Sequence, residues 1–192
     1  MVRGQSRQLQ PARILVVMGV SSSGKSTIGE AQASGLRLPF LDADTYHPPA
    51  NVAKMRAGTA LTDEDRWPWL KRYAAALAEA AKQGGVVGAC SALRRAYRDF
   101  LVERAGMPIL FIHLEGDRQL VTDRIARRQH HYMPASLLDS QFATLQVPGP
   151  DENAVSVPVD GDVAEVVARI RREVAPVFGK VSPSVPPACR IP

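Results

Sequence analysis

The chain has 192 residues, of which 45% are hydrophobic, enough for one compact domain that needs no disulfide or metal to hold its core. Its net charge of +5 and isoelectric point near 9.6 favour anionic partners: nucleotide phosphates, an acidic metabolite or nucleic acid. The 24 basic residues are scattered among 19 acids and only 6% of residues are aromatic, so the sequence lacks the basic, aromatic-interleaved stripe typical of a nucleic-acid-binding surface.

The cysteines and apolar runs favour a reducing compartment. Cys90 closes an apolar run and Cys189 lies in a Pro-rich tail, a spacing that suggests neither a metal site nor a disulfide. No cleavage-site pattern follows the first apolar run, and no run reaches the roughly 18 apolar residues of a membrane span. We therefore expect a soluble, cytoplasmic protein.

In chain order, a polar stretch over residues 1–12 predicts a flexible tail, and short apolar runs then alternate with amphipathic stretches. The apolar runs predict five strands: Ile14–Met18, Phe40–Leu41, Val86–Cys90, Ile109–Leu114 and Ala154–Val159. The amphipathic stretches predict six helices: Lys25–Leu36, Trp69–Lys82, Arg94–Arg104, Arg118–Arg128, Ser136–Thr144 and Val163–Val174. Four prolines in residues 179–192 predict a second flexible tail.

This alternation predicts a single three-layer α/β domain over residues 13–178, with a five-stranded parallel sheet covered on both faces. Two stretches interrupt the pattern. Residues 42–68 are rich in Pro, Gly and charge, and in residues 129–140 two histidines and a proline break the helical spacing. Because long irregular inserts in compact domains are often functional, we interpret the first as a substrate-binding insert and the second as a lid.

A phosphate-binding loop follows the first predicted strand. Its residues match G-x-x-x-x-G-K-[ST] in full, at Gly19, Gly24, Lys25 and Ser26. In such a loop the amides converge on a phosphate, the lysine reaches the β- and γ-oxygens, and the serine ligates Mg²⁺. We expect the nucleotide to contact Gly19, Ser21, Ser22, Ser23, Gly24, Lys25, Ser26 and Thr27. The alternative is a Gly/Ser-rich turn with an exposed lysine, and the loop by itself does not separate kinases from other nucleotide hydrolases.

Two carboxylates follow the second predicted strand. Asp42 and Asp44 are two residues apart, so an extended backbone points both to one side, at the end of a strand where clefts form. We assign Asp44 to orienting and deprotonating an attacking hydroxyl, and Asp42 with Ser26 to the metal. The run Val86–Cys90 leads to Ser91 without an acid, so it offers no further metal ligand. The alternative is a solvated turn.

A set of characteristic stretches runs from about Ile14 to Pro148: Met18–Ser21, Asp42–Asp44, His47-Pro48, Asn51, Lys54-Met55, Gly58, Leu61–Leu70, Cys90–Arg94, Tyr97–Asp99, His131, Ser140–Phe142, Leu145 and Pro148. In these stretches the sequence resembles the gluconokinase family. The resemblance implies a fold similar to that of nucleoside monophosphate and shikimate kinases. It also implies phosphorylation of D-gluconate to 6-phospho-D-gluconate with ATP and Mg²⁺, feeding the pentose phosphate or Entner-Doudoroff routes, and it favours a homodimer.

Three residues depart from the family pattern. Ser22 and His130 stand where the family usually has Gly, and Arg94 stands where Lys is common. The general phosphate-loop pattern needs no glycine at position 22, so we expect phosphate binding to survive. Arg94 preserves the charge but changes the donor geometry.

The insert offers groups for a linear polyol acid. Asp44 would hold the terminal hydroxyl, His47 would donate to or accept from a neighbouring one, and Arg66 would take the carboxylate, as similarity to shikimate kinases also suggests. Two plainer alternatives stay open. Arg66 can form a surface ion pair with Asp63 or Asp65, and His47 can be a packing imidazole.

Two pairs of arginines extend the candidate site. Arg94 and Arg98 lie one turn apart and could reach substrate or phosphate, or form a solvated helix face. Arg124 and Arg128 precede the lid, where an arginine can neutralise charge on the transferring phosphoryl group. Arg128 is nearer the lid, although Arg124 fits nearly as well.

His131 and Gln141, which lie in matching stretches, complete the candidate substrate-binding set, and we expect the adenine near the lid helix and the loop after Val159. Two rivals remain. One is a different small-molecule kinase, such as one for shikimate. The other is a regulatory or nucleic-acid-associated protein that uses the phosphate loop as a switch, against which the Asp42/Asp44 pair and the insert argue.

Overall fold

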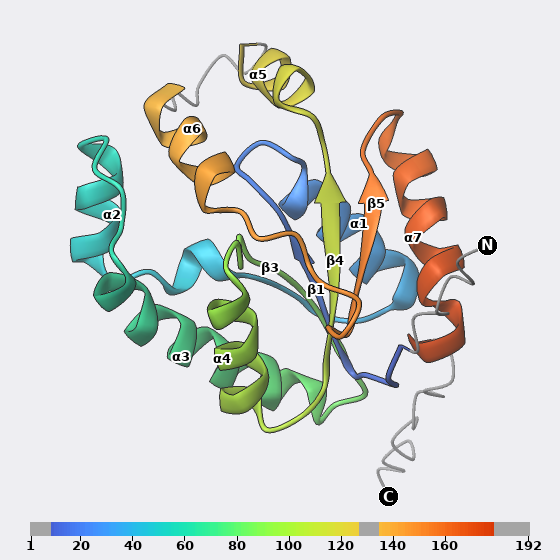
Figure 1. The fold of residues 1–192 in the computed structure, drawn as a ribbon. Helices are drawn as coiled ribbons and strands as arrows, with labels where there is room; N and C mark the ends of the chain where they lie inside the picture. The colour runs from blue at the N-terminus through green and yellow to red at the C-terminus, as the bar shows by residue number, and fades with distance from the viewer. Residues whose placement is uncertain (1–8, 127–134, 179–192) are drawn as a thin grey trace, which may run out of the picture.

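The computed structural model describes residues 9–126 and 135–178 and shows a sheet between two layers of helices (Figure 1). The five strands lie in the order β2-β3-β1-β4-β5, and every neighbouring pair is parallel. Their bounds are β1 Ile14–Met18, β2 Phe40–Asp42, β3 Val86–Ala89, β4 Ile109–Glu115 and β5 Ala154–Pro158. The predicted five-stranded parallel α/β fold is therefore confirmed.

The two faces of the sheet bury alternate residues of each strand. In β1, Ile14, Val16 and Met18 face α3 (Asp63–Ala81) and α4 (Arg95–Ala105). Leu15 and Val17 face α1 (Lys25–Leu36) and α7 (Val163–Phe178). Because both faces are covered, the strand is a continuous apolar run. The helices α5 (Arg118–Ala126) and α6 (Ala135–Thr144) stand at the carboxyl ends of the strands (Figure 1).

The insert is more regular than the sequence predicts. It contains a short 3-10 helix η1 (Ala43–Tyr46), the helix α2 (Pro49–Arg56) and the first residues of α3, which begins at Asp63 and not at Trp69. Thr62 and Asp65 form a capping box in which each side chain accepts from the other's main-chain N–H, at 3.4 and 2.9 Å. Pro68 suggests a helix boundary in the sequence, but it lies inside α3, where the cap and the buried face outweigh its missing donor.

The predicted amino-terminal tail is too long. Gln10 donates its main-chain N–H to Asn153 Oδ1 at 2.9 Å, Ala12 is buried, and Leu9 packs on the α7 side of the core. Residues 9–12 therefore belong to the domain. The tails over residues 1–8 and 179–192 lie outside the described residues.

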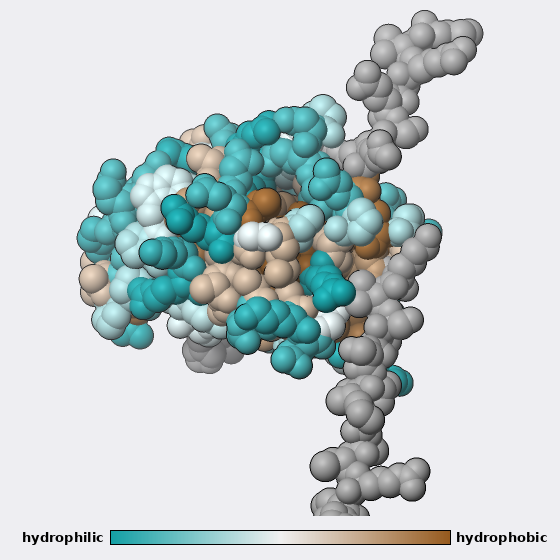
Figure 2. All heavy atoms as spheres, turned by 90° about the horizontal axis from the view of Figure 1, so that it is seen from below, coloured by the Kyte–Doolittle hydropathy of each residue, from teal (hydrophilic) through white to brown (hydrophobic). Residues whose placement is uncertain are grey.

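The face seen from below, at the amino ends of the strands, has polar residues around a small patch of apolar character (Figure 2). Among the helices of the described chain, none is long and apolar enough to span a membrane. The polar and charged groups of interest lie at the other end of the sheet.

Candidate active site

The phosphate loop joins β1 to α1 at the carboxyl edge of the sheet. Gly19 has φ 143° and Gly24 has φ 106°, conformations that favour glycine. A Cβ on Gly19 would come within 3.1 Å of Ser23 Oγ and 3.2 Å of the Leu114 carbonyl oxygen. Lys25 opens α1 and donates from Nζ to the Val20 carbonyl at 3.0 Å, so its side chain folds over the loop. This is the arrangement of an anion site at a helix N-terminus.

Ser22 lies in the left-handed region, with φ 63°. A residue with a side chain pays about 1–2 kcal/mol for this conformation, whereas glycine adopts it freely. Phosphate binding with serine at position 22 stays a prediction, and this loop has at that position a backbone turn that suits glycine.

Asp42 connects the phosphate loop to the insert. Ser26 Oγ donates to Asp42 Oδ2 at 2.6 Å, and Asp42 Oδ1 accepts from the Asp44 main-chain N–H at 3.0 Å. The second bond caps η1, and the chain therefore turns after Asp42 and does not stay extended. The Asp44 side chain is 81% exposed and is therefore accessible to an acceptor molecule.

His47 lies behind Asp44. Its side chain is 4% exposed, and its ring stacks on Trp69 with centroids 4.0 Å apart. Nε2 is 3.9 Å from Asp44 Oδ1, and Nδ1 is 3.4 Å from Asn51 Nδ2. Burial lowers the pKa of His47, and together with nearby Arg66 it outweighs the opposite effect of the Asp44 carboxylate, so the pKa is below its ordinary 6.5 and the ring is neutral near pH 7. The imidazole is thus packed against Trp69, as expected if His47 is a packing residue, but its Nε2 also faces Asp44.

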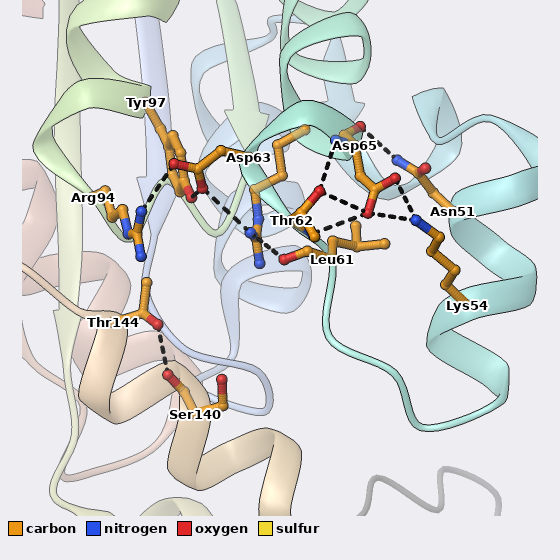
Figure 3. Close-up of polar contacts among 11 residues, drawn as sticks. Asn51, Lys54, Leu61, Thr62, Asp63, Asp65, Arg94, Tyr97, Ser140 and Thr144 are labelled. Atoms are coloured by element: carbon orange, nitrogen blue, oxygen red, sulfur yellow. Dashed lines mark hydrogen bonds and ion pairs between the residues drawn. The ribbon is translucent and has the colours of Figure 1, made fainter.

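Asp63, in the first turn of α3, gathers three donors (Figure 3). Tyr97 Oη donates to Oδ1 at 2.5 Å, Arg94 Nη1 donates to Oδ2 at 2.9 Å, and Arg66 Nη1 lies 3.7 Å from Oδ1. Both guanidinium groups lie over the Tyr97 ring, with Cζ 5.5 and 5.9 Å from its centroid. Burial and the bond to Asp63 raise the pKa of Tyr97, so the phenol stays protonated as a donor. The ion pair expected as the alternative for Arg66 is thus present, and it is shared with a second arginine.

Two cations that share one carboxylate leave a formal charge of +1. In the described part of the chain, Arg66 and Arg94 make their side-chain hydrogen bonds through Nη1 only, with Arg66 Nη1 also donating to the Leu61 carbonyl at 2.5 Å. Their Nη2 groups are thus left for a ligand. This arrangement suits an external carboxylate, which accepts paired N–H donors.

Arg98 is not a site residue, contrary to the expectation from the sequence. Its side chain is 1% exposed and forms a two-point ion pair with Glu152, Nε to Oε2 at 2.5 Å and Nη2 to Oε1 at 2.9 Å. Nη1 donates to the Ala92 carbonyl at 3.0 Å. Arg98 therefore fastens the start of α4 to the loop before β5, while Arg94, one turn away, faces the insert.

Gln141 lies on the nucleotide side. Its Oε1 accepts from the Ser21 main-chain N–H at 2.6 Å and its Nε2 bonds to Ser21 Oγ at 3.0 Å. These bonds join α6 to the phosphate loop. Gln141 was predicted to contact the acceptor substrate, but the structure shows it in contact with the phosphate loop. Two further candidates, Arg128 and His131, lie outside the described residues.

Arg124 also joins the phosphate loop. Its Nη1 donates to the Ser23 carbonyl at 3.0 Å and its Nη2 to the Val159 carbonyl at 2.7 Å. A cavity of about 260 Å³ opens beside these contacts, with apolar walls from Ile28, Val163 and Val166. Its position next to the loop and after Val159 suits the base of a nucleotide.

The residues present fit a nucleotide with its magnesium ion. Ser26 and Asp42 place two hard oxygen ligands side by side, which is what Mg²⁺ prefers beside phosphate oxygens. Ser23 Oγ is buried and has no hydrogen-bond partner among the described residues, so the loop keeps an unused polar group. The described chain holds no group of three or more His, Cys, Asp or Glu that would form a metal site by itself.

The parallel sheet, the phosphate loop and the insert define the chain as a P-loop kinase, a phosphotransferase. The sequence model of the shikimate kinase family matches residues 21–149. Gluconokinase from Gluconobacter oxydans is 49% identical over 146 residues, covering 76% of this chain and 82% of that protein. The chain belongs to the gluconokinase family, as the resemblance implied.

Solved structures agree with this assignment. A gluconokinase from Sinorhizobium meliloti superposes with a TM-score of 0.74 at 42% identity, covering 87% of this chain and 97% of that one. An unliganded sugar kinase from Janibacter sp. superposes with a TM-score of 0.80 at 40% identity, covering 91% and 98%. Family membership implies ATP use.

Sequence reasoning missed the residues that hold the site residues in place. Asp63, Tyr97 and Asn51 carry no motif chemistry of their own, and their roles depend on contacts between separate helices. All three residues lie in stretches that match the gluconokinase family, and the possible Arg66–Asp63 pair at i, i+3 spacing was a second signal, but neither signal gave their contacts.

Proposed function

We propose that this chain transfers the γ-phosphoryl group of ATP to the terminal hydroxyl of D-gluconate, giving 6-phospho-D-gluconate and ADP. One observation carries the proposal. Beside the phosphate loop, the insert brings together an exposed carboxylate, Asp44, and a pair of guanidinium groups, those of Arg66 and Arg94. These two features match the hydroxyl end and the acid end of a linear sugar acid. The 40–49% identity to gluconokinases over most of the chain supports the same substrate.

In this mechanism Asp44 accepts the proton of the attacking substrate hydroxyl. The hydroxyl oxygen bonds to the γ-phosphorus, and the bond between the γ-phosphorus and the β–γ bridging oxygen breaks, so that ADP leaves with the bridging oxygen. Lys25 and the loop amides hold the phosphates, and Arg124, within reach of the loop, offsets developing charge. Ser26 and Asp42 would hold Mg²⁺, which when bound neutralises phosphate charge. Four points stay predictions: Arg128 as a second lid arginine, His131 as a substrate contact, a homodimer and a cytoplasmic location.

A coupled ADP-release assay with gluconate, shikimate, glycerate and nucleosides tests the proposal. We expect gluconate to be the preferred acceptor, and absence of gluconate-dependent turnover would exclude the proposed function. Salt-dependent binding to DNA or RNA without acceptor phosphorylation would favour the switch protein instead.

Asp44→Asn tests the chemistry. It keeps the shape of the side chain and removes the base, so we expect kcat to fall by about 10²–10⁴-fold while ATP affinity changes little. Turnover within a few-fold of the unsubstituted enzyme would remove Asp44 from the role of base.

A further inference from the structure

Asn51 has a fixed amide orientation. The side chain is on α2, the residue is 3% exposed, and Nδ2 donates to the Asp65 main-chain carbonyl at 2.8 Å. A carbonyl oxygen only accepts, so the atom that faces it must be the amide nitrogen. The same nitrogen lies 3.4 Å from His47 Nδ1.

That orientation determines where neutral His47 carries its hydrogen. Since an amide nitrogen only donates, His47 Nδ1 must accept, and the ring hydrogen is therefore on Nε2. Nε2 faces Asp44 Oδ1 across 3.9 Å, and the stack on Trp69 keeps the ring from turning. The insert thus shows a hydrogen-bond donor, His47, beside an acceptor, Asp44.

The support for Asn51 comes from the cap of α3. Asp65 is held by the capping box with Thr62 and by Lys54 Nζ from α2, at 2.7 and 2.9 Å from its carboxylate oxygens (Figure 3). These bonds fix the Asp65 carbonyl relative to α2, and with it the Asn51 amide. The chain of contacts runs from the α3 cap to the reacting end of the site.

We propose that Asn51 is a positioning residue that holds His47 as the Nε2–H tautomer, so that His47 and Asp44 together recognise two neighbouring hydroxyls at the acceptor end of the substrate. One hydroxyl gives its hydrogen to Asp44 and is phosphorylated. The adjacent hydroxyl accepts from His47 Nε2. This inference rests on the proposed function, because it assigns the hydroxyls of a polyol acid to these groups.

Nitrogen NMR of histidine-labelled protein reads the tautomer directly, without activity. The chain has four histidines, and His47→Gln identifies the His47 signals by their loss. Above the ordinary histidine pKa of 6.5 we expect the unsubstituted protein to show the Nε2–H form. In Asn51→Asp the new carboxylate only accepts, so the neutral ring should change to the Nδ1–H form. Finding Nδ1–H in the unsubstituted protein would overturn the proposal.

Kinetics provide the second readout. For Asn51→Asp we expect kcat/KM for gluconate to fall by about tenfold or more, with the KM for ATP unchanged. The matched control is Asn153→Asp, which also removes an amide donor to main-chain carbonyls, those of Gln10 and Ile109, but lies away from the site. The control should keep the original kcat/KM. A tautomer change in Asn51→Asp without loss of gluconate turnover would overturn the proposal.

Two substitutions at His47 separate donor chemistry from packing. His47→Gln can accept from Asn51 through its oxygen and donate toward Asp44 through its nitrogen, so it should keep more of the gluconate kcat/KM than a variant without a donor. His47→Leu fills the space without a donor and should lose about tenfold or more. Equal losses would reject the donor role. If the unsubstituted enzyme does not phosphorylate gluconate, the proposed function fails by itself, and the NMR result still decides the tautomer.

Discussion

At the scale of single residues, the charge balance around Asp63 decides how the acid end of the substrate is held. One carboxylate keeps two guanidinium groups together over Tyr97, although two like charges this close would otherwise repel. Asp63 therefore organises the pair but does not neutralise it. The sequence showed each of these residues but not their convergence, because α3 and α4 meet only in the folded chain.

Asp63→Asn tests this role. The amide cannot hold both arginines, so we expect the KM for gluconate to rise about five- to tenfold, equivalent to roughly 1 kcal/mol, with kcat little changed. Steady-state kinetics measure it, with Asp99→Asn as the control because Asp99 is an exposed partner of Arg95 on the same helix as Tyr97. A KM below that of the unsubstituted enzyme would show that Asp63 competes with the substrate instead of organising its site.

At the scale of elements, α6 forms a link between the nucleotide loop and the acceptor side. Gln141 binds Ser21, and Leu138 packs with Val20 and Leu93. Beyond the helix, the Gln146 main-chain N–H donates to the Leu93 carbonyl at 2.8 Å, next to Arg94. The position of α6 is thus tied both to the loop that holds phosphate and to the start of α4.

Gln141→Ala removes both bonds to Ser21. Each is worth about 0.5–1.5 kcal/mol, so we expect the KM for ATP to rise by roughly tenfold while the KM for gluconate changes little. Gln119→Ala serves as the control, since Gln119 is exposed on α5 and bonds only to Asp123 in the described chain. A larger effect on gluconate than on ATP would return Gln141 to the substrate-binding role expected from the sequence.

Elements were predictable where a local pattern specifies them. The strands and α1 follow from apolar runs and the phosphate-loop motif, and the structure places them within one residue of the prediction. The start of α3 was missed because Pro68 suggests a break, although Thr62 and Asp65 carry a capping pattern that indicates the true start. The phosphate loop and the Asp42/Asp44 pair were likewise visible as motifs. The role of Arg98 was not, since only the fold brings Glu152 to it.

At the scale of the whole molecule, buried ionisable groups link stability to pH. Burial keeps His47 and His113 neutral by lowering the pKa of each below its ordinary 6.5. The unfolded chain then binds protons that the folded chain does not, so stability should decrease as the pH falls below about 6.5. Glu152 adds a second loss at lower pH. Its burial alone would raise the pKa, but the bonds from Arg98 and the Gly149 N–H outweigh it and lower the pKa below the ordinary 4.5.

Glu152→Gln separates these contributions. Removing one member of a buried ion pair leaves the Arg98 charge without its partner, and we expect about 3–5 kcal/mol lower stability at neutral pH. A folded-state pKa below the unfolded one contributes stability that is present above about pH 4.5 and lost below it. Asp65 and Asp151, whose pKa values are also lowered, keep part of this low-pH loss, so the variant should lose less stability below pH 4.5 than the original and keep the histidine step. Denaturant unfolding across this pH range measures both.

Replacing Arg98 and Glu152 together with leucine should recover much of the loss, because the unpaired charge is then gone. If the single variant were as stable as the original at neutral pH, the ion pair would not be what joins α4 to the loop before β5.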